Sequence, residues 1–126
     1  MLFDTDILIW VEKGNTKAAG LIEETPECFV SVQTYMELLQ GAGSRKRIQT
    51  IKDFVARNGF RVLPLTESIG HRALIYVEEY APLSGIRAGD AIIAATAIEN
   101  NLMLATGNRK HFESIPDLKF RWFLHG

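Results

Sequence analysis

The sequence predicts an α/β fold, with a parallel sheet of about five strands and helices on both faces. Short apolar runs alternate with longer segments of helical periodicity along the whole chain. The segment 90–100 is apolar on nearly all sides, which is typical of a helix buried against a sheet. Strands separated by helices form parallel sheets through right-handed crossovers, so the carboxyl ends of the strands are expected to share one edge.

Strands are predicted wherever a few apolar residues follow one another between polar or turn-forming residues. All of them are short, and the last is expected at an edge of the sheet. The predicted strands are residues 2–3, 29–32, 60–63, 102–105 and 120–124.

Helices are predicted where apolar residues recur every three or four positions between a capping residue and a stop signal. Asp6, Ser44 and Thr66 are the predicted N-caps of three of them. The helix after Thr66 is expected to end before residues 81–89, an irregular stretch with one proline and two glycines. Apart from that helix, the predicted helices are residues 7–12, 16–24, 33–40, 45–58, 90–100 and 109–115.

The length and composition predict a single domain, residues 1–126, that buries a core without disulfides. The one cysteine, Cys28, lies in an apolar run and is interpreted as a core residue of a protein in a reducing compartment. Neither a leader pattern nor an apolar stretch of ~20 residues is present, so a cytoplasmic protein without membrane association is expected. The net charge of -1 argues against nucleic-acid binding by bulk positive charge.

Four oxygen-bearing side chains are expected at the edge where the strands end. Asp4 is placed at the end of the first strand, because an ionised carboxylate inside a buried strand is costly. Glu37 lies about one turn into the helix after the second strand, Asp90 begins the most apolar helix, and Asn108 follows the fourth strand. In open α/β sheets this edge collects ligands and catalytic groups.

Such a set of side chains suggests a divalent metal ion. Carboxylates that lie close together repel one another unless a cation neutralises them, and oxygen ligands suit Mg²⁺ or Mn²⁺ rather than zinc. Ordinary roles remain open for each residue: Asp4 and Asp90 as helix caps, Glu37 as a solvated helix residue, and Asn108 as a turn former.

Four blocks follow one another along the chain: LFDTDILI at 2–9, SV and MEL within 31–41, GDAIIAATA at 89–97, and LATGNRKHF at 104–112. Together they resemble the motifs of PIN-domain ribonucleases, and most closely those of the VapC toxins of bacterial type II toxin–antitoxin modules. The resemblance spans essentially the whole chain. It implies a PIN fold, Mg²⁺- or Mn²⁺-dependent endoribonuclease activity, a homodimer, and neutralisation by a VapB-like antitoxin.

The resemblance also implies roles for individual residues. The expected catalytic and metal-binding acids are Asp4, Glu37 and Asp90, and the expected reaction is hydrolysis of RNA phosphodiester bonds by a metal-activated water.

Four further side chains are expected to support this metal site. Thr5, Asp6 and Thr106 are expected to orient the ligands through hydrogen bonds, with local capping as the alternative for the two threonines. Asn108, together with Thr106, stands at the fourth metal position, where the family often has Asp, while Asp6 stands where Asn is common. These two departures leave the number of bound ions open.

RNA phosphates are expected to contact basic residues close to the same edge, namely Arg87, Arg109 and Lys110. The basic run 45–47 is interpreted as a solvated helix face. His111 is interpreted as a surface or hydrogen-bonded residue rather than a general acid.

The dimer and antitoxin surfaces are expected to draw on aromatic anchors, with core packing as the alternative for each. The candidates are Trp10, Tyr35, Tyr76, Tyr80 and Trp122.

Two other functional classes are alternatives for a sequence with acids at strand ends. A phosphoacceptor signalling domain would need an acceptor Asp after the central strand, and residues 60–66 contain none. A non-catalytic interaction module of the same shape would leave the three acids without a role. A metal-dependent nuclease assay separates these classes.

Overall fold

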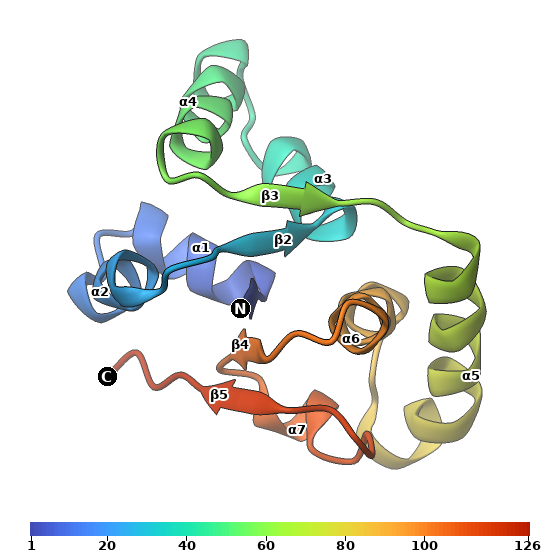
Figure 1. Cartoon of the computed structure of the whole chain (residues 1–126). Helices are drawn as coiled ribbons and strands as arrows, with labels where there is room; N and C mark the ends of the chain where they lie inside the picture. The colour runs from blue at the N-terminus through green and yellow to red at the C-terminus, as the bar shows by residue number, and fades with distance from the viewer.

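The computed structural model describes residues 1–126 and contains one five-stranded sheet. The strands lie in the order β3-β2-β1-β4-β5, and every neighbouring pair is parallel. This arrangement confirms the predicted α/β class (Figure 1). The strands are β1 (Leu2–Phe3), β2 (Phe29–Ser31), β3 (Arg61–Leu63), β4 (Leu104–Thr106) and β5 (Phe120–Trp122).

Seven helices connect the strands, and most begin at a side chain that caps them. Asn15, Ser31, Ser44 and Thr66 each accept a hydrogen bond from the backbone N–H three residues later, which pairs a donor that the helix itself leaves free. The helices are α1 (Thr5–Glu12), α2 (Thr16–Glu24), α3 (Val32–Gln40), α4 (Arg45–Arg57), α5 (Glu67–Ser84), α6 (Ala88–Glu99) and α7 (Arg109–Phe112).

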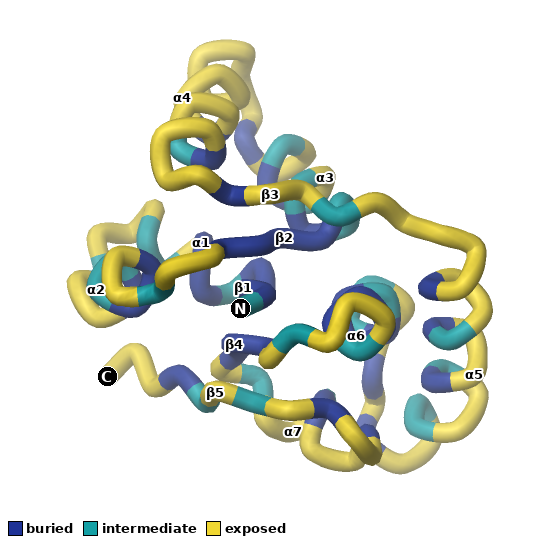
Figure 2. Tube along the Cα trace, in the orientation of Figure 1, coloured by how far each residue is buried: buried dark blue, intermediate teal, exposed yellow.

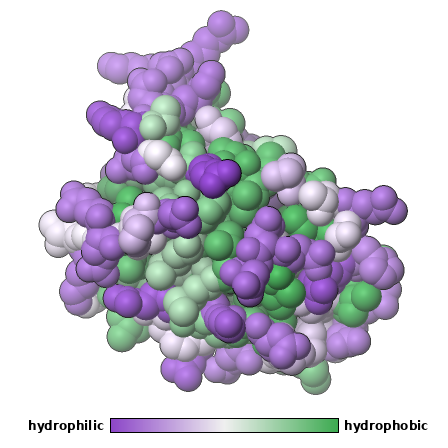
Figure 3. All heavy atoms as spheres, in the orientation of Figure 1, coloured by the Kyte–Doolittle hydropathy of each residue, from purple (hydrophilic) through white to green (hydrophobic).

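The helices cover both faces of the sheet and bury a core on each. Successive strand residues point to opposite faces, so Leu2 packs with side chains of α5, α6 and α7, whereas Phe3 packs with side chains of α1 to α4. The central strands are buried throughout, and α4 is mostly exposed (Figure 2). Hydrophilic side chains cover α4 where it projects at the top of Figure 3, which agrees with a solvated helix face at residues 45–47.

The first turns of α1 and α6 differ from the predictions. Asp4, not Asp6, caps α1, because the chain passes directly from β1 into a helix that begins at Thr5. Asp6 therefore lies inside the first helical turn. Helix α6 begins at Ala88, so Asp90 also lies within a first turn rather than at the start of its helix.

The predicted irregular stretch 81–89 is wrong at both ends, because α5 continues to Ser84 and α6 begins at Ala88. Pro82 lies in the last turn and lacks the N–H that would bond to the carbonyl four residues earlier. The hydroxyl of Ser84 donates to the carbonyl of Tyr80 at 3.0 Å. Gly85 then ends the helix in the left-handed conformation, with φ at 73°.

The strands that follow β1 in the sequence are added first on one side of it and then on the other. The chain builds β2 and β3 on one side of β1, crosses back through α5 and α6, and places β4 and β5 on the other side. Connections therefore leave the adjacent carboxyl ends of β1 and β4 in opposite directions. Ligand sites of open α/β sheets lie at such switch points, which in this chain are occupied by Asp4 and Thr106.

None of the helices combines the length and the apolar character needed to cross a membrane.

The fold generates a prediction for stability. Leu104 of β4 is fully buried between the two helical layers, and Leu83 of α5 is 76% exposed. We expect Leu104→Ala to lower the free energy of unfolding by about 2–5 kcal/mol, because it leaves a cavity. The matched change Leu83→Ala should stay within about 0.5 kcal/mol. Urea unfolding of both variants measures this, and equal losses would contradict the position of β4 in the core.

Candidate active site

The carboxyl ends of the strands open into a cleft of about 590 Å³. Six of the predicted site residues come together in its lining, although they lie on four different segments of the chain; besides Thr5 they are Asp4, Asp6, Glu37, Asp90 and Asn108. Thr106 lies beneath the cleft in contact with Asp4.

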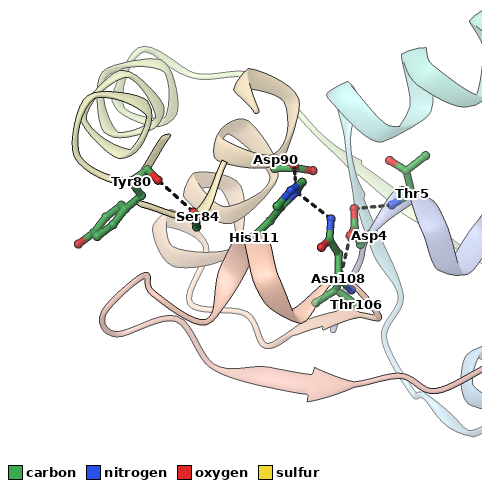
Figure 4. Close-up of polar contacts among 8 residues, drawn as sticks. All are labelled: Asp4, Thr5, Tyr80, Ser84, Asp90, Thr106, Asn108 and His111. Atoms are coloured by element: carbon green, nitrogen blue, oxygen red, sulfur yellow. Dashed lines mark hydrogen bonds and ion pairs between the residues drawn. The ribbon is translucent and has the colours of Figure 1, made fainter. Parts of the chain in front are cut away.

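Asp4 is the most buried of these acids, with 4% of its surface exposed. One carboxylate oxygen, Oδ1, accepts a hydrogen bond from the backbone N–H of Thr5 at 2.8 Å. The other, Oδ2, accepts from the hydroxyl of Thr106 at 2.7 Å (Figure 4). Because Thr106 ends β4 and Asp4 follows β1, this second bond joins the two strands at the switch point.

The electrostatics of the cleft disfavour a further negative charge. Burial, together with the negative charge of Asp6, raises the pKa of Asp4 to about 8, although the hydrogen bond from Thr106 opposes the shift. Burial also raises the pKa of Asp6, against hydrogen bonds from the backbone N–H groups of Gly107 and Ile7 and a hydrogen bond shared with the side chain of Asp4. Both shifts have the sign expected of carboxylates crowded together without a cation.

Glu37 reaches the cleft because α3 and α6 approach closely at a glycine. Its Oε1 accepts a hydrogen bond from Nε2 of Gln33, one turn earlier, at 3.1 Å. A Cβ atom at Gly89 would lie 3.1 Å from that nitrogen and 3.4 Å from Glu37 Oε1. Gly89, the residue before Asp90, therefore leaves the space in which these side chains sit.

Asp90 and Asn108 meet at a histidine whose position was not predicted from the sequence. Nδ1 of His111 lies 2.8 Å from Asp90 Oδ2 and 2.8 Å from Asn108 Nδ2 (Figure 4). A single ring nitrogen carries either a proton or a lone pair, so only one of these contacts is a hydrogen bond at a time. Since a carboxylate only accepts, the bond to Asp90 requires a proton on Nδ1.

Thr5 contacts a residue that the sequence analysis did not single out. Its hydroxyl donates to the hydroxyl of Thr34 at 3.0 Å, and Thr34 is fully buried on α3. The only sign of this contact in the sequence is that Thr34 lies on the apolar side of the predicted helix 33–40. The bond ties α1 to α3 directly beside Asp4.

The three predicted RNA-binding residues are exposed and do not line the cleft. Arg109 bonds to Glu113 at 3.1 Å, and its guanidinium lies 5.1 Å from the ring centre of Trp122. The cleft wall instead includes aromatic rings that the sequence did not identify as site residues. Trp10 and His125 both line it and stack with ring centres 3.9 Å apart.

The donor set fits a divalent cation by its chemistry. All the acidic groups that line the cleft offer oxygen, which Mg²⁺ and Mn²⁺ prefer, and Oδ1 of Asp6 is buried without a hydrogen-bond partner. No three His, Cys, Asp or Glu side chains converge as they stand to hold an ion. Instead, Asp90 contacts His111 and Glu37 bonds to Gln33.

Comparison with known proteins places this geometry in a family. The PIN domain model matches residues 1–118. The chain is 32% identical to "Ribonuclease VapC10" of Mycobacterium tuberculosis, over 94% of this chain and 90% of that protein. A toxin–antitoxin complex from Klebsiella pneumoniae contains a similar chain, with 33% identity, a TM-score of 0.77 and 93% of each chain covered. VapBC-1 from nontypeable Haemophilus influenzae matches with 30% identity, a TM-score of 0.77 and 96% of each chain covered.

The raised pKa of Asp4 generates a prediction for the metal-free protein. Between its ordinary value of 3.8 and about 8, the folded protein holds a proton that the unfolded chain has released. The free energy of unfolding should therefore fall as the pH rises through this range and level off above it. Asp4→Asn should weaken this dependence and make the metal-free protein more stable than the wild type at pH 8.

Denaturation in a chelator at several pH values measures the effect. The control is Asp53→Asn, which changes an exposed acid on α4 that bonds only to Gln49. A wild-type stability that rises from pH 5 to pH 8 would contradict the predicted sign.

Proposed function

Because the chain belongs to the PIN-domain family, we propose that it is a cytoplasmic, metal-dependent endoribonuclease and the toxin of a type II toxin–antitoxin pair. The observation that carries this proposal is the acidic cleft at the switch point between β1 and β4. The similarity to a protein named as a ribonuclease, over 94% of this chain, supports the choice of RNA as substrate. We take the whole chain, residues 1–126, as one PIN domain.

In this proposal Asp4, Glu37 and Asp90 hold Mg²⁺ or Mn²⁺, and Asn108 stands beside them. When bound, the ion polarises the phosphate and makes an attacking water acidic enough to act as a nucleophile. The reaction is hydrolysis of a phosphodiester bond of RNA. It requires neither a serine nor a cysteine nucleophile, and the single cysteine, Cys28, is buried in the core.

The protein's own contribution is to hold the acids in place. Thr106 and the Thr5 N–H each occupy one oxygen of Asp4, so that carboxylate cannot rotate freely. His111 holds Asp90 in the same way from α7. Partners that fix a metal ligand typically matter to metal affinity or activity by about 10- to 100-fold.

The substrate backbone needs positive charge that the cleft itself does not supply. We assign this role to Arg87, Arg109 and Lys110, which are exposed outside the cleft lining. Arg87 precedes the first turn of α6, which contains Asp90. Contacts with phosphates position a nucleic acid without reading its sequence.

We further propose a VapB-like antitoxin as partner and a homodimer as the assembly. Two similar solved structures are toxin–antitoxin complexes by name. Tyr76 is buried in the core, so its interpretation as a surface anchor is wrong. Large apolar side chains are nevertheless exposed and available for contacts; they include Met36, Leu65, Leu74, Leu83 and Leu124.

The catalytic proposal predicts the effect of removing single acids. Asp4→Asn or Asp90→Asn should lower Mg²⁺-dependent RNA cleavage by about 100-fold or more, a loss comparable to that of a general acid or base. Circular dichroism should be unchanged, because each substitution keeps the shape of the side chain. Asp53→Asn is the matched control on an exposed surface. Wild-type cleavage in a folded Asp4→Asn protein would rule out the acid cleft as the catalytic centre.

The assembly proposal predicts that the purified chain has the mass of two copies at micromolar concentration. Light scattering coupled to size exclusion measures this mass. We expect Leu74→Asp to shift the mass toward one copy if α5 contributes to the contact, because Leu74 is 57% exposed on that helix. If the wild-type protein has the mass of one copy, the homodimer proposal is wrong.

A further inference from the structure

We infer that Asp6, rather than Asn108, supplies the fourth oxygen ligand of the metal site, through its Oδ1 atom. The inference rests on the proposed metal-dependent function and goes beyond it, because Asp6 changes from a residue that orients ligands into a ligand. It differs from the sequence-based expectation that the fourth position belongs to Asn108.

The first observation is an unpaired oxygen. Oδ1 of Asp6 is the only buried side-chain nitrogen or oxygen in the structure without a hydrogen-bond partner. A buried carboxylate oxygen without a donor is costly, and such atoms call for an explanation. Asp6 lines the same cleft as Asp4, Glu37 and Asp90, and its carboxyl also lies within hydrogen-bond reach of the Asp4 carboxyl. Two carboxylates can bond to each other only through a shared proton, so a cation bound among the ionised acids would give Oδ1 the partner that they cannot give one another.

The second observation is that the other oxygen of Asp6 is held by the backbone. Oδ2 accepts a hydrogen bond from the N–H of Gly107 at 3.0 Å. A Cβ atom at Gly107 would lie 3.1 Å from that oxygen and 3.0 Å from the carbonyl oxygen of Phe123, so a glycine is what permits this close approach. The carboxylate is therefore fixed by one oxygen, and the second is left for a ligand.

The third observation concerns the contacts that Asn108 makes. Its side-chain amide lies 2.8 Å from Nδ1 of His111, and its backbone N–H donates to the hydroxyl of Thr106 at 3.0 Å. These contacts give Asn108 a role in holding the loop after β4. An amide is also neutral, and it offsets less of the cost of dehydrating Mg²⁺ than a carboxylate does.

The two residues have therefore exchanged roles relative to the family pattern that the sequence resembles. The carboxylate that Asn108 lacks is present at Asp6, across the loop at Gly107. Four acids, Asp4, Asp6, Glu37 and Asp90, then line the cleft.

The rival explanation is that Asp6 serves only to hold the loop through Gly107. Asp6→Asn separates the two roles, because the amide oxygen of asparagine still accepts the bond from Gly107 while the negative charge is lost. A purely structural role predicts unchanged metal affinity in this variant.

Calorimetric titration of the full chain with Mn²⁺ tests the inference. We expect Asp6→Asn to weaken Mn²⁺ binding by about tenfold or more, at least the loss seen when a residue supporting a ligand is removed. Asn108→Ala should weaken binding far less. A second measurement is the rise in melting temperature caused by Mn²⁺, which should shrink in Asp6→Asn and persist in Asn108→Ala and in the control Asp53→Asn.

Wild-type affinity in Asp6→Asn, or an equal loss in Asn108→Ala, would overturn the role of Asp6. An RNA cleavage assay on the same preparations separates this outcome from failure of the proposed function. If Mn²⁺ binding depends on Asp6 but the protein cleaves no RNA, the role of Asp6 is supported and the proposed nuclease activity is overturned. A wild-type chain that binds no Mn²⁺ overturns both.

Discussion

The hydrogen bond between Thr106 and Asp4 is the contact on which the candidate site depends. It spans 2.7 Å between the end of β4 and the residue that follows β1, two neighbouring strands whose residues lie 102 positions apart in the chain. Without it, Oδ2 of Asp4 would be buried without a donor, because the N–H of Thr5 pairs only with Oδ1. The bond thus makes a buried Asp4 tolerable, and it sets the carboxylate at the point from which the crossovers leave in opposite directions.

A different local contact brings each of the other acids toward Asp4. Gly89 lets α3 approach α6 so that Glu37 reaches the cleft, and Gly107 lets its own N–H meet Asp6. His111 holds Asp90 from α7. Burial, together with the negative charges of Asp6 and Asp90, raises the pKa of Asp4 and costs stability at neutral pH. A folded protein retains such a cost where function requires it.

The sequence alone determined much of the architecture and the main acids. Alternating apolar runs and helical segments were sufficient for the α/β class, and the rule that ionised groups avoid strand interiors placed Asp4 at a strand end. Local signals were weaker where two readings compete. Asp6 is as good a cap as Asp4, and Pro82 breaks a helix interior but is tolerated in a last turn, so the ends of α1 and α5 followed from packing rather than from propensity.

The tertiary structure decided which atoms of these residues are paired. Both Asp6 and Asn108 are polar residues near strand ends, and nothing in their sequence neighbourhood shows which side-chain atom will lack a hydrogen-bond donor. Only the folded chain shows that the N–H of Gly107 donates to one oxygen of Asp6 and leaves the other without a donor, while the amide nitrogen of Asn108 lies beside His111. The physical reason is that a hydrogen bond between distant segments forms only where the fold brings their backbones close together. That distance depends on the whole tertiary structure.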